Sequence, residues 1–178
     1  FSKDSRGIID FFRQTKIMNI LVLISSYRLI EGFIRATLPT MFKDWGMSFE
    51  QIGFSLGIAA PIAALAGAIV AGRLTNSLNR IKALLIFGGL QTISALGYLL
   101  LANSNIQPPM QTILPVILID HFISGMTTVA LFSVMMDWSR KTHGGTDYTC
   151  MDCIGVFAMM FGAGFSYWLA SKGGYSLS

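Results

Sequence analysis

The sequence predicts an all-α membrane protein, a bundle of transmembrane helices joined by short loops. Hydrophobic residues make up 53% of the 178 residues and charged residues only 12%, whereas soluble domains average about 25% charged residues. The apolar residues gather in five segments, each with the ~20 residues that a membrane-spanning helix needs. Short breaks rich in glycine, asparagine and proline separate them. The predicted transmembrane segments are residues 17–42, 50–71, 83–102, 111–137 and 147–171.

The first segment, residues 17–42, is apolar except for three charges near its middle, Arg28, Glu31 and Arg35. A charge at the centre of a transmembrane helix costs on the order of 3 kcal/mol on insertion scales. The spacing places the three side chains within about 60° of arc on one helical face. This pattern indicates that they line a solute or ion pathway. The alternative is that Arg28 and Glu31 neutralise each other and only hold neighbouring helices together.

The second and third segments, 50–71 and 83–102, are predicted by apolar composition after the break at Gly46. Pro61 predicts a kink or hinge, which neighbouring helices can accommodate in a membrane. Small residues at helical spacing predict close packing of the second segment. They are Gly53, Gly57, Ala60, Ala64, Gly67 and Ala71.

The fourth segment, 111–137, carries a polar stripe. Asp120, Ser124 and Thr127 share one face of the helix. His121 is adjacent and can titrate near neutral pH, although it could equally be an interfacial or packing histidine. The stripe therefore adds candidates for the same pathway.

The fifth segment, 147–171, follows Gly144–Gly145 and has small residues at every fourth position, from Ala158 to Ala170. Cys150 and Cys153 have the spacing of a metal or redox pair, but no second cluster of ligands accompanies them. We expect no metal and no cofactor.

Two of these charges lie at a similar depth. Arg35 is ~8 Å outward of the middle of its segment, at 1.5 Å per residue, and Asp120 is displaced in the same direction. We expect Arg35 and Asp120 to face one another or to share a water molecule or solute. Glu31, Asp120 and His121 are candidates for carrying a coupling proton.

Basic residues in the loops give the orientation. Nine lie on one side of the predicted bundle, namely Lys3, Arg6, Arg13, Lys16, Arg73, Arg80, Lys82, Arg140 and Lys141. The opposite side has Lys43 and Lys172. The N-terminus and the loops 72–82 and 138–146 are therefore expected in the cytoplasm, with the protein in the inner membrane. Residues 1–16 are expected to form a linker or an amphipathic arm. The net charge of +4 suits anionic lipid better than nucleic acid.

The loop after the second segment contains Gly72, Leu74 and Arg80 at the spacing of a known signature. It resembles the Gly-x-Leu-x-Asp-Arg-x-Gly-Arg loop of the major facilitator superfamily, with Asn76 where the signature has aspartate. The resemblance implies a gating loop. The residues assigned to it are Gly72, Asn76 and Arg80, together with Asp137 and Arg140 at the next loop on that side.

Two further stretches narrow the resemblance, 27–53 and 136–149. They are similar to the C-terminal half of a subgroup that holds muropeptide permeases, acetyl-coenzyme A transporters and siderophore permeases of the pyochelin and rhizobactin type. The resemblance implies five of the six transmembrane helices of one half. The chain, which begins at Phe1, is thus expected to be a piece of a longer protein that also has an N-terminal six-helix half and a last helix.

We therefore expect part of a secondary active transporter that works by alternating access. Two arginines against one glutamate in the first segment favour a medium-sized anionic solute, and the resemblance favours a siderophore. The alternatives are a muropeptide or acetyl-coenzyme A-type permease, and a non-transporting membrane sensor or assembly protein. The sequence shows no nucleophile–base set or phosphate-binding loop, so we do not expect an enzyme.

Overall fold

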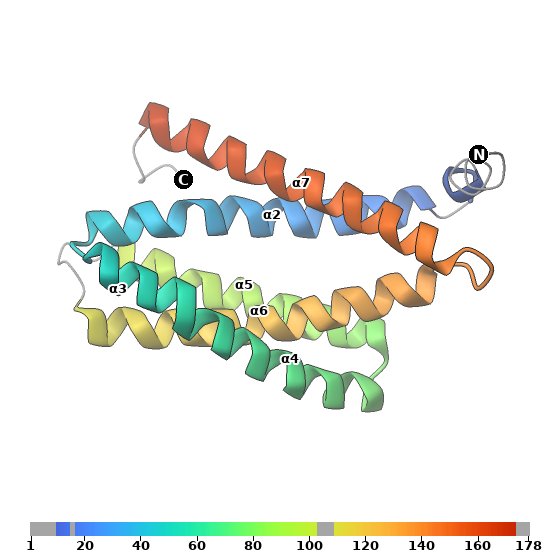
Figure 1. Cartoon of the computed structure of the whole chain (residues 1–178), viewed down its shortest axis with the longest axis horizontal. Coiled ribbons are helices and arrows are strands. Elements are labelled where there is room, and N and C mark those ends of the chain that lie inside the picture. Colours follow the sequence, from blue (N-terminus) through green and yellow to red (C-terminus); the bar gives the residue numbers. More distant parts are fainter. Residues whose placement is uncertain (1–9, 15–16, 103–108, 174–178) are drawn as a thin grey trace. The chain divides into compact units, whose positions relative to one another are not determined.

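The computed structural model describes residues 10–14, 17–102 and 109–173 and is helical throughout its long elements (Figure 1). In chain order the elements are α2 (Ile17–Asp44), α3 (Phe49–Phe54), the π-helix η1 (Ser55–Ala59), α4 (Ala60–Ser77), α5 (Arg80–Ala102), α6 (Met110–Trp138) and α7 (Gly144–Gly173). The described ranges contain no strand. Five helical segments are long and apolar enough to cross a membrane, which confirms the predicted all-α, polytopic fold. The predicted arm lies mostly outside the described residues and stays a prediction.

Gly46 and Ser48 form the turn between the first two membrane segments. Gly46 has a φ of 82°, a left-handed conformation that only glycine adopts easily. Ser48 caps α3: its Oγ accepts a hydrogen bond from the Gln51 amide at 3.2 Å, and the Gln51 side chain accepts one from the Ser48 amide at 2.9 Å. This capping box satisfies two donors that would otherwise lack partners at the helix start. Gly46, Ser48 and Gln51, which lie in the stretch 27–53 that resembles the family, therefore form a turn and a helix cap.

A turn of π-helix precedes Pro61. Proline has no N–H, and its ring clashes with the carbonyl group four residues earlier in a regular helix. In η1 the Ala60 amide instead donates to the carbonyl of Ser55. Such single π turns are a known way to accommodate a local disruption within a helix. The irregularity lies where the sequence predicted it, and its use as a hinge stays a prediction.

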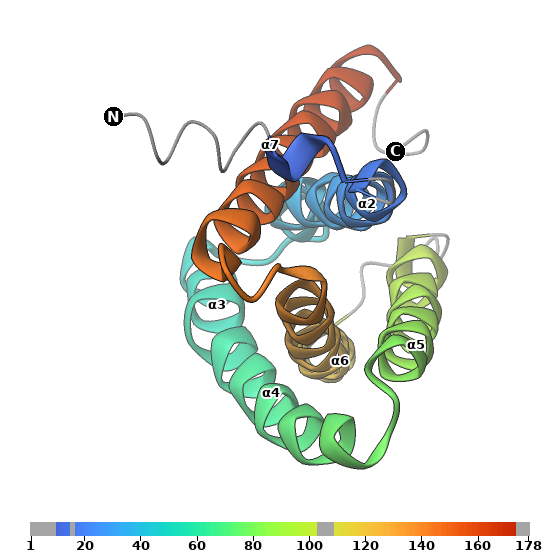
Figure 2. The same ribbon diagram turned by 90° about the vertical axis from the view of Figure 1, so that its right-hand side faces the viewer.

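The chain divides into two compact units, unit 1 (Phe1–Leu38 and Met135–Ser178) and unit 2 (Pro39–Val134). In unit 1, α2 and α7 lie side by side (Figure 2). A Cβ atom added at Gly32 would overlap the carbonyl of Met159, and one added at Gly162 would overlap the carbonyl of Leu29. Glycine on each helix therefore lets the two backbones touch.

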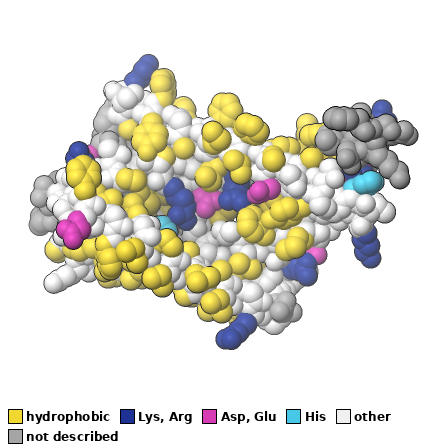
Figure 3. Space-filling model, viewed as in Figure 1, with side chains coloured by type: hydrophobic (Ala, Val, Ile, Leu, Met, Phe, Trp, Pro, Cys, Tyr) yellow, Lys and Arg dark blue, Asp and Glu magenta, His cyan; other side chains and the backbone are white. Residues whose placement is uncertain are grey.

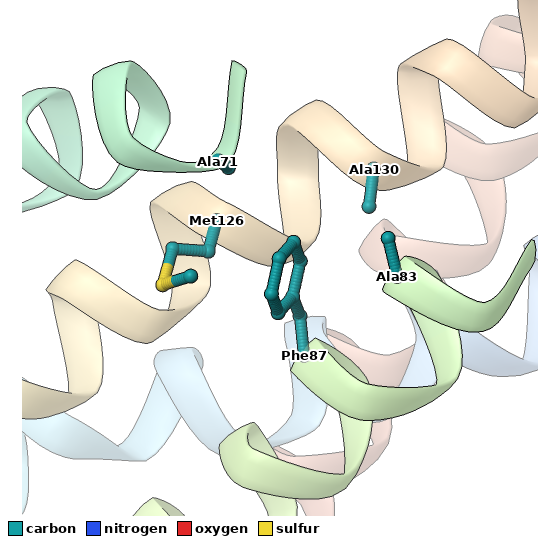
Figure 4. Packing of buried hydrophobic residues seen from close by; sticks show 5 residues of the cluster. All are labelled: Ala71, Ala83, Phe87, Met126 and Ala130. Atoms are coloured by element: carbon teal, nitrogen blue, oxygen red, sulfur yellow. The ribbon is translucent and has the colours of Figure 1, made fainter. Parts of the chain in front are cut away.

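In unit 2, α6 lies between α4 and α5 (Figure 2). A Cβ atom at Gly67 would overlap the carbonyl of Phe122, and one at Gly125 would overlap the carbonyl of Ala64. On the other side of α6, a Cβ atom at Gly97 would come within 3.2 Å of a Val116 methyl carbon. A hydrophobic cluster joins the three helices through Ala71, Ala83, Phe87, Met126 and Ala130 (Figure 4).

The glycines of the second segment differ in their surroundings: Gly67 lies against the backbone of α6, whereas Gly53 has open space beside it within the described part of the chain. Substitution of each by alanine tests this packing. Gly67→Ala must displace backbone atoms and is expected to destabilise the protein by about 1–3 kcal/mol. A Cβ atom at Gly53 meets nothing within 4 Å among the described residues. Gly53→Ala is the matched control and is expected to be neutral or to stabilise the helix by up to about 1 kcal/mol. Thermal unfolding in detergent would measure both. Equal melting temperatures for the two variants would contradict this packing.

Candidate functional site

The three predicted charges of α2 form a connected network in unit 1. Glu31 lies between the two arginines: its Oε2 is 3.3 Å from Nη1 of Arg28, and its Oε1 is 3.2 Å from Nε of Arg35. The spacing of three and four residues brings these side chains onto one helical face. Glu31 is only 8% exposed. Figure 3 shows basic and acidic side chains alternating in a row on this face of the molecule.

A fourth charge, Asp152 of α7, completes the network. Its Oδ1 lies 3.6 Å from Nη2 of Arg28. Gly155, one turn further along α7, leaves room for the arginine, because a Cβ atom there would come within 3.2 Å of Arg28 Cγ. The sequence analysis missed Asp152. A carboxylate inside an apolar segment was the signal that could have identified it.

Asp152 changes the charge balance from which an anionic solute was predicted. Two arginines against one glutamate favoured an anionic solute, but Arg28 and Arg35 are matched by Glu31 and Asp152. The network is formally neutral. An anionic group that binds a guanidinium group of this network therefore competes with Glu31 or Asp152.

Asp120 forms a second polar cluster, in unit 2. The residue is 5% exposed, and its Oδ1 lies 2.7 Å from Oγ of Ser94. Its Oδ2 lies 3.4 Å from the hydroxyl of Tyr98 and 3.8 Å from Nδ1 of His121. Ser94 and Tyr98 belong to α5 and were missed. Which residues contact Asp120 depends on which helix packs against α6, and a single sequence does not indicate which helices are neighbours.

The rest of the predicted stripe is buried in α6. Ser124 is 3% exposed and Thr127 is fully buried, with its Oγ1 donating to the Ile123 carbonyl at 3.0 Å. The predicted pairing of Arg35 with Asp120 would join residues of different units and stays a prediction.

The residues assigned to the gating loop occupy different elements. Gly72 and Asn76 lie in α4, because this helix continues to Ser77 rather than ending at residue 71 as predicted. The side chain of Asn76 is outside what the structure describes. Arg80 is the first residue of α5, and Asp137 is near the end of α6.

The predicted loop residue Arg140 makes the best-defined ion pair among the described residues. Its amide, Nε and Nη2 donate to the carboxylate of Asp147 at 3.0, 2.8 and 2.7 Å. Asp147 is fully buried in the first turn of α7, where a negative charge also complements the helix dipole. The hydrogen bond to Asp147 raises the pKa of Arg140 above its ordinary value. The pair fixes the start of α7 to the loop after α6.

The two cysteines are free thiols in α7, with Cys150 half-buried and Cys153 exposed. Within the described ranges, no group of three or more histidine, cysteine or acidic side chains could hold a metal ion.

Comparisons with known proteins agree on one family. The sequence profile of the Major Facilitator Superfamily matches residues 20–178. The anhydromuropeptide permease of Escherichia coli (strain K12) is 27% identical over 169 residues, which cover 94% of this chain and 34% of that protein. The "Putative transporter AmpG 4" of Rickettsia conorii is 24% identical over 143 residues, 80% of this chain and 34% of that protein. The chain thus spans about a third of the length of these relatives.

Proposed function

The chain belongs to the major facilitator superfamily, and from this premise we propose that it is part of a secondary transporter of the inner membrane that moves a muropeptide-like solute by alternating access. It is a multi-pass membrane protein, and its family and relatives point to a transporter rather than an enzyme. The positive-inside rule supports a cytoplasmic N-terminus.

The relatives change the preferred substrate. The sequence-based preference for a siderophore finds no support among them, whereas a muropeptide, the alternative, is what the E. coli relative is named for. A muropeptide carries acidic peptide groups on a sugar, so it offers carboxylates to a guanidinium group. An acetyl-coenzyme A-type solute and a non-transporting sensor remain the competing proposals.

The observation that carries this proposal is the neutral network on α2 and α7. Arg28 contacts Glu31 at 3.3 Å and Asp152 at 3.6 Å. Glu31 is buried between two arginines, whereas the Asp152 side chain is 38% exposed and has the longer contact. Asp152 is therefore the carboxylate that a solute anion displaces most easily. We assign Arg28 to solute binding and Asp152 to competition with the solute.

Uptake of radiolabelled anhydromuropeptide by cells that express the full-length protein tests the proposal. Asp152→Asn removes the competitor and is expected to lower KM by about fivefold, because a partly exposed ion pair contributes up to about 1 kcal/mol. Glu50→Gln, which removes an exposed carboxylate outside the network, is the matched control and leaves KM unchanged. Absence of uptake by a correctly inserted protein would overturn the proposed function.

A further inference from the structure

Cys150 and Cys153 lie one turn apart on α7, and the proposed function does not use them. Both are free thiols, with Cys150 half-buried and Cys153 exposed among the described residues. Residues three apart are neighbours on the surface of a helix. Side chains of a helix also lean toward its N-terminus, so the thiol of Cys153 leans over the turn that holds Cys150. The two thiols are therefore neighbours on one face of α7.

The geometry of a regular helix comes close to what a disulfide requires. Cα atoms three residues apart are about 5 Å from one another in an α-helix, within the range of about 4.4–6.8 Å that disulfides span. The Cβ atoms, about 5–6 Å apart, must approach to about 3.5–4.5 Å. A tightening of this one turn by about 1–2 Å is enough. We propose that Cys150 and Cys153 form a site of reversible oxidation, at which a peroxide joins the two thiols as a disulfide.

The reaction balances with one molecule of hydrogen peroxide and two thiols. The thiolate of Cys153, the more exposed cysteine, attacks one peroxide oxygen: an S–O bond forms, the O–O bond breaks, and the departing hydroxide takes up the proton that the thiol released. The sulfur of Cys150 then attacks the sulfenic acid, so that an S–S bond forms and a second water leaves. The two thiols lose two electrons, which reduce the peroxide to two water molecules. A dithiol reductant returns two electrons and two protons and restores both cysteines.

The turn that closes also carries Asp152. The Oδ1 atom of Asp152 lies 3.6 Å from Nη2 of Arg28, and ion pairs extend to about 4 Å. Tightening the turn by about 1–2 Å exceeds the margin of this contact. The disulfide is therefore expected to separate Asp152 from Arg28. Since Asp152 is proposed to compete with the solute for Arg28, oxidation removes this competitor, and this step rests on the proposed function.

Peptide mapping of the full-length protein after treatment with hydrogen peroxide tests the oxidation site without any solute. We expect a peptide that contains both cysteines, is lighter by two hydrogen atoms and returns to its original mass with dithiothreitol. Cys150→Ser lacks the second thiol, so its Cys153 is expected to remain a sulfenic acid that dimedone traps. Two free thiols in the treated wild type, or a trapped sulfenic acid there without a disulfide, would overturn the proposal.

Uptake kinetics measure the consequence for the solute, with anhydromuropeptide as the probe. Oxidised wild type is expected to show the KM of Asp152→Asn, about fivefold below that of the reduced protein. Asp152→Asn treated with peroxide is expected to change no further. Cys150→Ser, treated in the same way, is the matched control for oxidation elsewhere and keeps its KM. An unchanged KM of fully oxidised wild type would overturn the control of solute binding. Absence of uptake by both reduced and oxidised protein, with the disulfide formed, would overturn the proposed function alone.

Discussion

Replacing Arg28 by methionine is expected to abolish uptake by the full-length protein and to destabilise it by about 1 kcal/mol, because the partly exposed carboxylate of Asp152 loses its cation. Within this network, Arg28 links α2 to Asp152. Glu31 keeps its contact with Arg35 at 3.2 Å, so Asp152 carries the uncompensated charge. Uptake assays and melting temperatures in detergent would measure the two effects.

A double variant separates the two roles of Arg28. Arg28→Met combined with Asp152→Asn restores a neutral network and is expected to recover most of the lost stability, while uptake stays absent because the guanidinium group assigned to solute binding is missing. Arg28→Lys keeps the positive charge but lacks the planar guanidinium group, so its uptake is expected to fall between that of the wild type and that of Arg28→Met. Wild-type uptake by Arg28→Met would contradict the assignment of this residue to solute binding.

The second large effect is expected at the start of α7. Arg140→Ala removes the side-chain hydrogen bonds that Arg140 gives to the buried Asp147, and of the hydrogen bonds described for that carboxylate it leaves the one from the Arg140 amide. We expect a clear drop in melting temperature and a fraying of the first turn of α7, measured by hydrogen exchange of residues 144–150.

The matched variants define what this pair contributes. Asp147→Asn alone keeps the shape of the side chain and loses the charge, so it is expected to lower the melting temperature less than Arg140→Ala does. The double variant Arg140→Ala with Asp147→Asn is expected to be more stable than Arg140→Ala, because a neutral buried amide costs less than an unpaired carboxylate. A double variant as unstable as Arg140→Ala would show that the arginine acts through packing instead.

Part of the site was predictable because it is local. Arg28, Glu31 and Arg35 interact along one helix, and a spacing of three and four residues is enough to predict such contacts. Asp120 was identifiable as a carboxylate inside an apolar segment. Gly72 and Asn76 were assigned to a loop because the predicted segment ended at residue 71, whereas α4 continues to Ser77. The exact end of a helix depends on local hydrogen bonds, such as the one that the Leu78 amide donates to the Leu74 carbonyl, which apolar composition does not predict.

The sequence alone determined the all-α membrane fold, since the free energy of placing apolar segments of about 20 residues in a bilayer depends on composition and length, not on neighbours. Only the tertiary structure decided which helices share a backbone contact, that Asp152 neutralises Arg28, and that Ser94 lies against Asp120. The physical reason is that packing across many residues fixes which side chains of neighbouring helices meet. Small residues such as Gly32 and Gly67 let another helix backbone come into contact at their positions, whereas bulkier residues elsewhere keep the helices apart.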